Sequence, residues 1–247
     1  MGRLLDGRLG RAMSDVKHEK VPLDISRYLS KDDGLRAVDE VGDSLAEVGR
    51  MIVSTTAEGV TFLHAFAISA SVRATGLHRA IRSAIADNNP HAVFPLLRSY
   101  VETAMVICYL TDRPSEVRSF LGLPESDPAS RLRPSSQKLI DHAARRYSGI
   151  KALWAELSDL THLGSPAVWM PWVIEDEQQR LTTIASFPRW RRPQEALIAC
   201  GEAVEIGDVV VQELNRLREA HLEKVPGSSE VVAQTAFVSI RPESPKS

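Results

Sequence analysis

Apolar residues recur with helical periodicity over most of the chain between residues 31 and 222. Ser30 precedes Asp33 by three positions, the spacing of a helix N-terminal cap, and this pair opens the first periodic stretch. The apolar face of that stretch comprises Leu35, Val38, Val41, Leu45, Val48, Ile52 and Val53. Further helices are predicted over residues 61 to 88, 89 to 112, 116 to 123, 136 to 162 and 193 to 222.

The stretch from residue 89 to 112 is apolar on almost every side. A helix of this kind lies at the centre of a domain. It carries one opposite-charge pair, Arg98 and Glu102, spaced one helical turn apart. Charges on a buried helix need partners inside the protein, so this pair is the first candidate site. Pro95 within the pattern predicts either a kink or a later helix start.

The periodicity changes over residues 168 to 185, where Val, Trp, Ile and Thr flank a charged turn, and this predicts a β-hairpin. Residues 1 to 30 are polar and predict an extended or disordered segment. Residues 223 to 247 predict a flexible tail, with a further strand over 231 to 240. The sequence therefore predicts a mainly α protein whose single domain spans residues 31 to 222. That domain is a bundle of about five long helices, with the hairpin inserted between the last two.

Composition narrows the class of protein. The 247 residues are 43% hydrophobic and 25% charged, with a formal net charge of -2, which argues against a surface built wholly for nucleic acid or anionic lipid. Cys108 and Cys200 lie in apolar helical stretches without a CxxC spacing and are expected to be packing thiols in a reducing cytosol. We expect a cytoplasmic protein that does not span a membrane, because the N-terminus lacks a long apolar run and the central helix is charged. Arg outnumbers Lys and Ala is abundant, which suggests a GC-rich bacterial genome.

The usual catalytic motifs are missing from the sequence. It has no GxSxG, P-loop, GxGxxG or HExxH and no zinc-type spacing of Cys and His, which excludes most common hydrolase, kinase and dehydrogenase routes. A di-iron bundle needs two Glu-x-x-His units, whereas the chain offers one Asp-x-x-His at Asp159 and His162, with Glu156 one turn earlier. Neither a metal nor another cofactor is expected.

Two short motifs carry a resemblance to a known family. The first is Pro-Leu-Leu-Arg-Ser-Tyr-Val-Glu, which ends at Glu102, and the second is Leu-Ser-x-x-x-His over residues 157 to 162, followed by the hairpin. Over residues 60 to 220 the chain resembles a family of uncharacterised bacterial helical proteins that is distantly similar to the HEPN group. The resemblance implies a cytosolic bundle of four or five helices. HEPN relatives include ribonuclease toxins, antitoxin partners and abortive-infection proteins.

What the resemblance implies about function is a ligand- or partner-binding module with a regulatory or defence role, whose partner is a protein, a nucleotide or RNA. The alternative is a metal-independent ribonuclease of the HEPN toxin type. A homodimer is expected, because the first and last helices have wide apolar faces and HEPN proteins commonly dimerise.

The main candidate site combines Arg98 and Glu102 with His162 at the end of another core helix. An arginine, a carboxylate and an imidazole in one pocket could bind phosphate or perform acid–base chemistry. Tyr109 and Tyr147 are further candidates for the same pocket. The alternative is a buried hydrogen-bonded network that sets the helix register, with the tyrosines packed in the core.

Two other groups of residues could bind phosphate. Arg216 and His221 match the Arg-x(4 to 6)-His pattern of HEPN ribonucleases, although Leu217 replaces the polar residue that usually follows the arginine. They are the alternative catalytic pair, and a solvated helix face is the competing interpretation. The second group could contact phosphates and stack a base, or could instead meet the acidic hairpin turn. It comprises Arg189, Trp190, Arg191 and Arg192.

Overall fold

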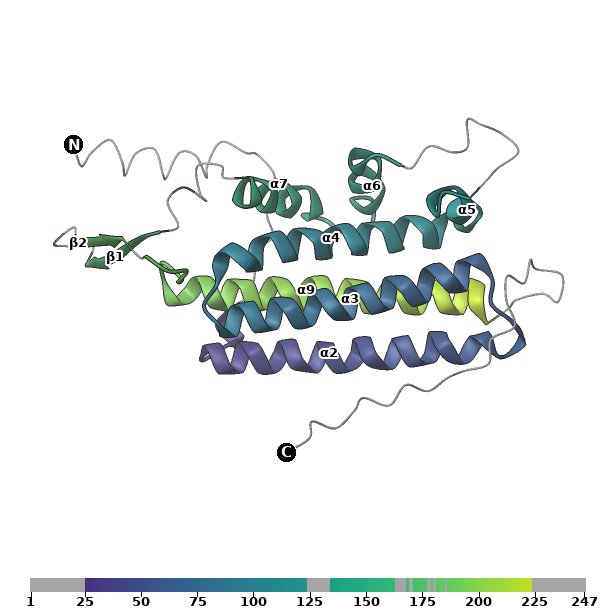
Figure 1. Cartoon of the computed structure of the whole chain (residues 1–247), viewed down its shortest axis with the longest axis horizontal. Helices are drawn as coiled ribbons and strands as arrows, with labels where there is room; N and C mark the ends of the chain where they lie inside the picture. The colour runs from purple at the N-terminus through teal and green to yellow at the C-terminus, as the bar shows by residue number, and fades with distance from the viewer. Residues whose placement is uncertain are drawn as a thin grey trace.

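The computed structural model describes residues 25 to 123, 134 to 162, 168, 171 to 176, 179, 181 to 184 and 186 to 223. This part of the chain is mainly helical, as predicted (Figure 1). Its elements are η1 (Ile25–Arg27), α2 (Lys31–Ser54), η2 (Thr55–Glu58), α3 (Phe62–Ala86), α4 (Pro90–Asp112), η3 (Pro114–Glu116), α5 (Val117–Phe120), α6 (Ser136–Ala143), α7 (Ile150–Thr161), β1 (Trp172–Asp176), β2 (Leu181–Ile184), α9 (Pro193–Leu217) and η5 (Arg218–Leu222).

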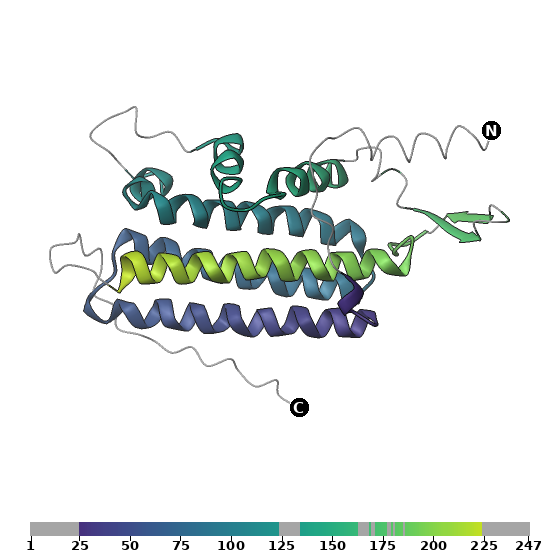
Figure 2. The same cartoon turned by 180° about the vertical axis from the view of Figure 1, so that it is seen from behind.

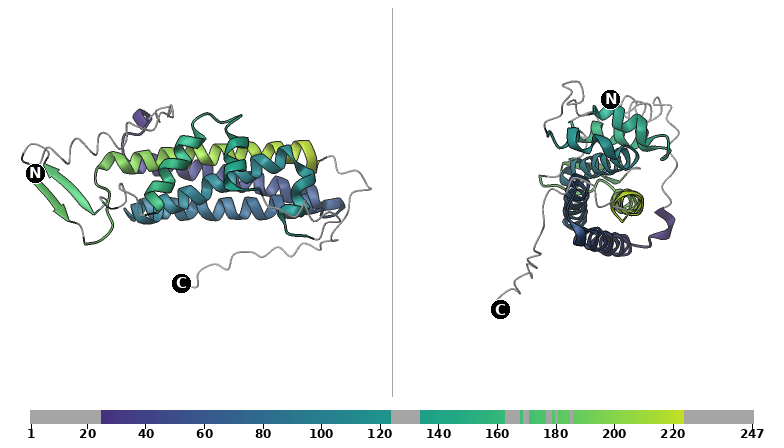
Figure 3. Two further views of the ribbon diagram at one scale, coloured as in Figure 1. Left: turned by 90° about the horizontal axis from the view of Figure 1, so that it is seen from above. Right: turned by 90° about the vertical axis from the view of Figure 1, so that its right-hand side faces the viewer.

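Four long helices, α2, α3, α4 and α9, lie side by side and form the body of the protein (Figures 1 and 2). Helix α2 contacts α3 and α9, and α4 contacts the same two helices from the other side. The end-on view in Figure 3 shows this arrangement. Helices α6 and α7 pack against α4 on the side away from α2, so α4 has neighbours on both sides. Its predicted central position is confirmed.

Local capping explains where the long helices begin. The hydroxyl of Ser30 accepts a hydrogen bond of 3.2 Å from the backbone N–H of Asp33, as the spacing predicts. The side chain of Asn89 caps α4, and Pro90 occupies its first turn, where a missing N–H has no consequence. Because α4 continues through Pro95, the later start that this proline allowed is wrong.

The core runs the length of the four long helices. The first helix buries the predicted face, with Val38, Leu45 and Ile52 among its least exposed side chains, and both cysteines are buried and unpaired. Helix α4 is long and apolar enough to cross a membrane by length and composition. However, 61% of its most apolar window is buried within the bundle, which is typical of the core helix of a soluble protein.

The helix predicted over residues 136 to 162 is divided into α6 and α7, which corrects the sequence interpretation. The turn between them ends at Gly149, whose φ of +86° lies in the left-handed region that glycine adopts without strain. The same turn directs Arg146 and Tyr147 toward α9, where both bind a buried carboxylate. Tertiary hydrogen bonds therefore outweigh the continuous apolar pattern.

Strands β1 and β2 pair antiparallel, with Trp172 opposite Ile184, and the register shifts between Ile174 and Asp176. The pair extends beyond the end of the bundle, ahead of α9 (Figure 1). The predicted extension over residues 1 to 24, the tail from residue 224 and the strand over 231 to 240 lie outside the described residues.

Candidate functional site

The predicted Arg98 and Glu102 pair lies at the interface of α4 and α7 and is only partly buried. The Arg98 guanidinium carbon is 4.4 Å from the ring centroid of Trp154, and its Nε donates to the hydroxyl of Ser158 at 3.2 Å. Its Nη2 is 3.9 Å from Oε1 of Glu102, a loose ion pair whose side chains are 25% and 37% exposed. The expectation of a buried pair is therefore wrong, because Trp154 covers the guanidinium while the carboxylate still reaches solvent.

His162 does not join this pair. It is the exposed C-terminal cap residue of α7, because the helix ends at Thr161. Within the described part of the chain, no hydrogen bond or ion pair links its imidazole to Arg98 or Glu102. Tyr109 also lies elsewhere, because eleven residues separate it from Arg98 along α4, a rise of about 16 Å. The five residues predicted to share a pocket are thus divided among four places, because Tyr147 is bound to Glu213 of α9.

The structure instead assembles charged residues where the end of α4, the α6–α7 turn and the end of α9 meet. We call this group the ion-pair cluster; it comprises Asp112, His142, Arg146, Glu213 and Arg216. Two carboxylates face two guanidiniums and an imidazole, so the charges are close to balance. Two predicted residues belong here: Arg216 is a member of the cluster, and Tyr147 donates to it.

Glu213 is the buried centre of the cluster, with a side chain that is 0% exposed. Its carboxylate accepts hydrogen bonds of 2.8 Å from Arg146, 2.8 Å from Arg216 and 2.5 Å from the hydroxyl of Tyr147. Burial and this hydrogen bond raise the pKa of Tyr147. Three donors from two segments thus compensate for the removal of one carboxylate from water.

Asp112 is the second acceptor of the cluster and the last residue of α4. A carboxylate at a helix C-terminus meets the negative end of the helix dipole, so it requires cationic partners. His142 Nε2 donates to it at 2.8 Å and Arg146 at 3.1 Å, and Arg216 pairs with its other oxygen. Partial burial alone would raise the pKa of Asp112, but the His142 hydrogen bond and the two arginine charges outweigh that effect and lower it.

Cys108, Asp112 and His142 have ligand atoms within 4.8 Å of one another, close enough to surround a metal ion. Their environment does not fit one. Arg146 donates to the sulfur of Cys108 at 3.2 Å and also to Asp112, so a fixed positive charge already lies among the three. Burial raises the pKa of Cys108 to about 12, which keeps the thiol protonated at neutral pH. We infer that the guanidinium of Arg146, and not a metal, balances the charge of Asp112 among these three residues.

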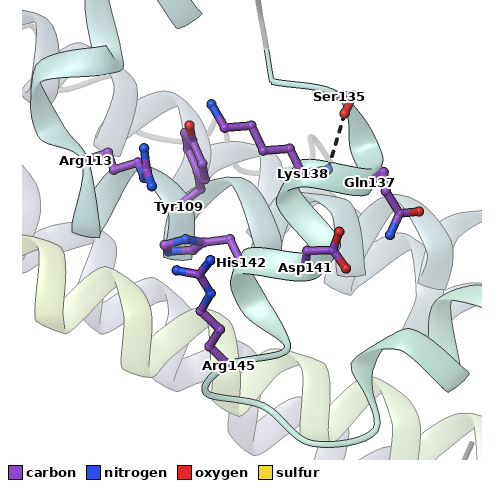
Figure 4. Close-up of a pocket in the computed structure, with 8 residues that line it drawn as sticks. All are labelled: Tyr109, Arg113, Ser135, Gln137, Lys138, Asp141, His142 and Arg145. Atoms are coloured by element: carbon purple, nitrogen blue, oxygen red, sulfur yellow. Dashed lines mark hydrogen bonds between the residues drawn. The ribbon is translucent and has the colours of Figure 1, made fainter.

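Beside the cluster lies a pocket of about 360 Å³, which we call the basic pocket (Figure 4). Its lining residues come from the end of α4, the segment after it and α6: Tyr109, Arg113, Ser135, Gln137, Lys138, Asp141, His142 and Arg145. Three of them are permanent cations. Among the described lining residues Asp141 is the single carboxylate, and it is paired with Lys151 outside the pocket at 2.6 Å. Arg113 is likewise paired, with Glu116 at 3.1 Å, so Lys138 and Arg145 supply the positive charge that these pairs leave over.

A buried tyrosine of the basic pocket, Tyr109, contacts several of its polar neighbours. The hydroxyl of Tyr109 donates to Glu116 at 2.6 Å, and the cationic groups of Arg113 and Lys138 each lie 5.2 Å from the centre of its ring. Figure 4 shows these two side chains flanking Tyr109. Ser135 caps α6, so the positive end of this helix also points to the pocket wall. The arrangement suits an anion.

His221, the other half of the predicted catalytic pair, has a separate contact. Its Nε2 lies 2.8 Å from the carbonyl oxygen of Thr111, and Arg216 is held by the ion-pair cluster. A guanidinium that already neutralises two carboxylates is a poor phosphate ligand, because the anion would have to displace them. The Arg-x(4)-His spacing therefore corresponds to two structural contacts, one from the end of α9 and one from η5.

Two arginines of the Arg189 to Arg192 group form hydrogen bonds with β1. Arg189 donates to Glu175 at 2.8 Å, and Arg191 donates to the carbonyl of Trp172 at 3.2 Å. Trp190 is buried against Phe94, with ring centroids 6.1 Å apart, so the prediction that it stacks a base is wrong. Arg192 is exposed at the start of α9. The alternative predicted from the sequence is that these arginines meet the acidic hairpin turn. The contact of Arg189 with Glu175 agrees with that alternative.

Sequence reasoning missed four members of the ion-pair cluster as site residues: Asp112, His142, Arg146 and Glu213. One signal was available for Glu213: it lies one turn before Leu217, so it falls on the apolar face of the last helix. An acidic residue on such a face needs a buried cationic partner. No local signal identified that partner, because Arg146 is 67 residues away.

Comparison with protein-family models, with curated proteins and with solved structures finds no match for this chain. The relation to the HEPN group therefore remains a prediction from the two short motifs.

Proposed function

We propose that this protein binds a ligand through a phosphate group or a comparable anion, held in the basic pocket. The observation that carries the proposal is the set of Lys138 and Arg145, beside the Glu116-paired Arg113, around one pocket in which the one carboxylate among the described lining residues is already paired. Arginine and lysine are the usual side chains for phosphate recognition. In this proposal the protein is a HEPN-like binding module of several long helices, with the β1–β2 hairpin inserted ahead of α9.

The ion-pair cluster supports such a role by fixing one wall of the pocket. His142 lines the pocket and is held by Asp112, which in turn is held by Arg146 and Arg216. A binding site built on side chains that are already restrained loses less conformational entropy when the ligand arrives. The cluster thus holds His142 in place, while Lys138 and Arg145 remain available for the ligand.

Titration calorimetry with inorganic pyrophosphate and with adenosine triphosphate tests this proposal. We expect the Arg145→Ala variant to raise the Kd at least about tenfold, because one charge-assisted hydrogen bond is worth about 1.5 to 3 kcal/mol. Arg145 is exposed and is therefore dispensable for folding. The control is Arg79→Ala, which removes an exposed arginine of α3 that does not line the pocket. Equal affinity in the two variants would contradict the proposal.

A metal-independent ribonuclease is the second candidate, and the pairing of His142 with Asp112 favours it. An imidazole whose Nε2–H is held by a carboxylate can accept a proton at Nδ1, here from a ribose 2′-hydroxyl, while the pocket cations bind the phosphodiester. With labelled RNA and a chelator present, His142→Ala should then lower the cleavage rate at least about 100-fold. His221→Ala, which removes a contact to a backbone carbonyl, should leave it unchanged. No cleavage by the unmodified protein would exclude this candidate and leave the binding proposal standing.

A further inference from the structure

A second pocket, of about 280 Å³, lies between α4, the α6–α7 turn, α7 and α9. We call it the α7–α9 pocket. Its walls are mostly apolar and come from three helices: Val101 and Ala104 of α4, Ile150 and Leu153 of α7, and Ile206 and Val209 of α9. Its volume is near the lower end of the range for small-molecule sites, which is about 300 to 1,000 Å³. A ligand with one ring or a short alkyl chain fits this space.

The charges of this pocket are acidic, in contrast to those of the basic pocket. Glu202 and Glu205 line it from α9, and Glu202 is 3% exposed. The one cation among the described lining residues is Arg146, whose guanidinium is already bound by Glu213 and Asp112 of the ion-pair cluster. Arg146 therefore contributes little uncompensated charge, and the other charged residues among the described lining are the two glutamates.

Apolar walls beside two carboxylates select for a particular chemistry. A carboxylate next to apolar surface attracts cations strongly because little water screens it. An anionic ligand would meet like charge, and a neutral apolar ligand would leave the carboxylates without a new partner. We propose that the α7–α9 pocket binds a small organic cation, in which an ammonium group meets Glu202 and Glu205 and an apolar body packs against Val101, Leu153 and Ile206. This site is independent of the proposed phosphate site.

The test is titration calorimetry with 2-phenylethylamine and the larger tryptamine, compared with the uncharged 2-phenylethanol. We expect saturable binding of at least one amine and at least about tenfold weaker binding of the alcohol, because a charged hydrogen bond is worth about 1.5 to 3 kcal/mol. Glu205→Gln, at an exposed position, should weaken amine binding at least threefold without loss of folding. The matched control Glu40→Gln removes an exposed carboxylate of α2 outside the pocket and should leave it unchanged.

Glu202→Gln provides the stronger version of the same test. Because this carboxylate is buried in the pocket, its loss should weaken amine binding at least tenfold, with folding checked by circular dichroism. The proposal is overturned if the alcohol binds as tightly as the amines, if Glu205→Gln binds them unchanged, or if neither amine shows saturable binding. Pyrophosphate binding in the basic pocket should be the same in all of these variants, so failure of this proposal is distinguishable from failure of the proposed phosphate site.

Discussion

Glu213→Ala is expected to lower the free energy of unfolding by about 3 kcal/mol, the lower end of the range for breaking a buried ion pair. The substitution removes the shared acceptor of Arg146, Arg216 and Tyr147. Two guanidiniums would then face each other with only Asp112 to balance them. The expected loss is not larger because the two arginine side chains are 36% and 35% exposed and can recover some hydration. Urea unfolding followed by circular dichroism measures the effect.

Glu219→Ala is the control for this prediction. Glu219 follows α9 in the same region and pairs with Arg218, but its side chain is 63% exposed. Exposed pairs of this kind contribute about 0 to 1 kcal/mol, so we expect little change in the urea midpoint. Glu213→Gln should fall between the two, because it keeps a hydrogen-bond acceptor and loses the charge. A loss below about 1 kcal/mol for Glu213→Ala would mean that the cluster does not hold α9 to the α6–α7 turn.

The second large effect is expected at Gly207, where α9 passes close to α2. A Cβ at this position would lie well inside van der Waals contact with Cγ1 of Val41 and 3.1 Å from the hydroxyl oxygen of Tyr100. Both neighbours are buried and packed, so the helices would have to separate or repack. We expect Gly207→Ala to lower the free energy of unfolding by about 1 to 3 kcal/mol, despite the better helix propensity of alanine.

Gly76→Ala should raise the free energy of unfolding, whereas Gly207→Ala should lower it. Gly76 is exposed within α3, and a Cβ there would meet nothing within 4 Å. The substitution therefore changes only the conformational freedom that the backbone loses on folding. It should stabilise the protein by about 0.5 to 1 kcal/mol. Adding Val41→Ala to Gly207→Ala should give a smaller loss than the sum of the two single losses, because the methyl that obstructs the new Cβ is removed. Additive losses would show that the clash with Val41 is not the cause.

The helices themselves could be predicted from local patterns. Helix α2 begins at the cap formed by Ser30 and buries the face that the periodicity indicated, because amphipathic spacing and capping act within a few residues of the chain. The central position of α4 followed from the same kind of information, since a helix that is apolar all round must be covered on all sides. The division of residues 136 to 162 was missed, although Ser148 and Gly149 are residues that commonly end a helix.

The candidate site could not be predicted in the same way. Arg98 and Glu102 were chosen for their isolation on an apolar helix, yet the structure leaves both partly exposed, while the carboxylate of Glu213 is fully buried. A pattern along one helix shows which face is apolar, but not how deeply each position is covered by neighbouring elements. Burial at each position depends on α6, α7 and α9, which reach α4 from distant parts of the chain.

The sequence by itself determined that the protein is mainly helical, where α2 begins, which face of α2 is buried and that α4 is central. These properties depend on propensity, capping and periodicity over one or two helical turns. Only the tertiary structure decided which charges meet. Asp112 binds Arg216 from 104 residues away, and Glu213 binds Arg146 from 67 residues away. Nothing local specifies such pairs, because ion pairing depends on which side chains the packed helices bring within a few ångströms and away from water.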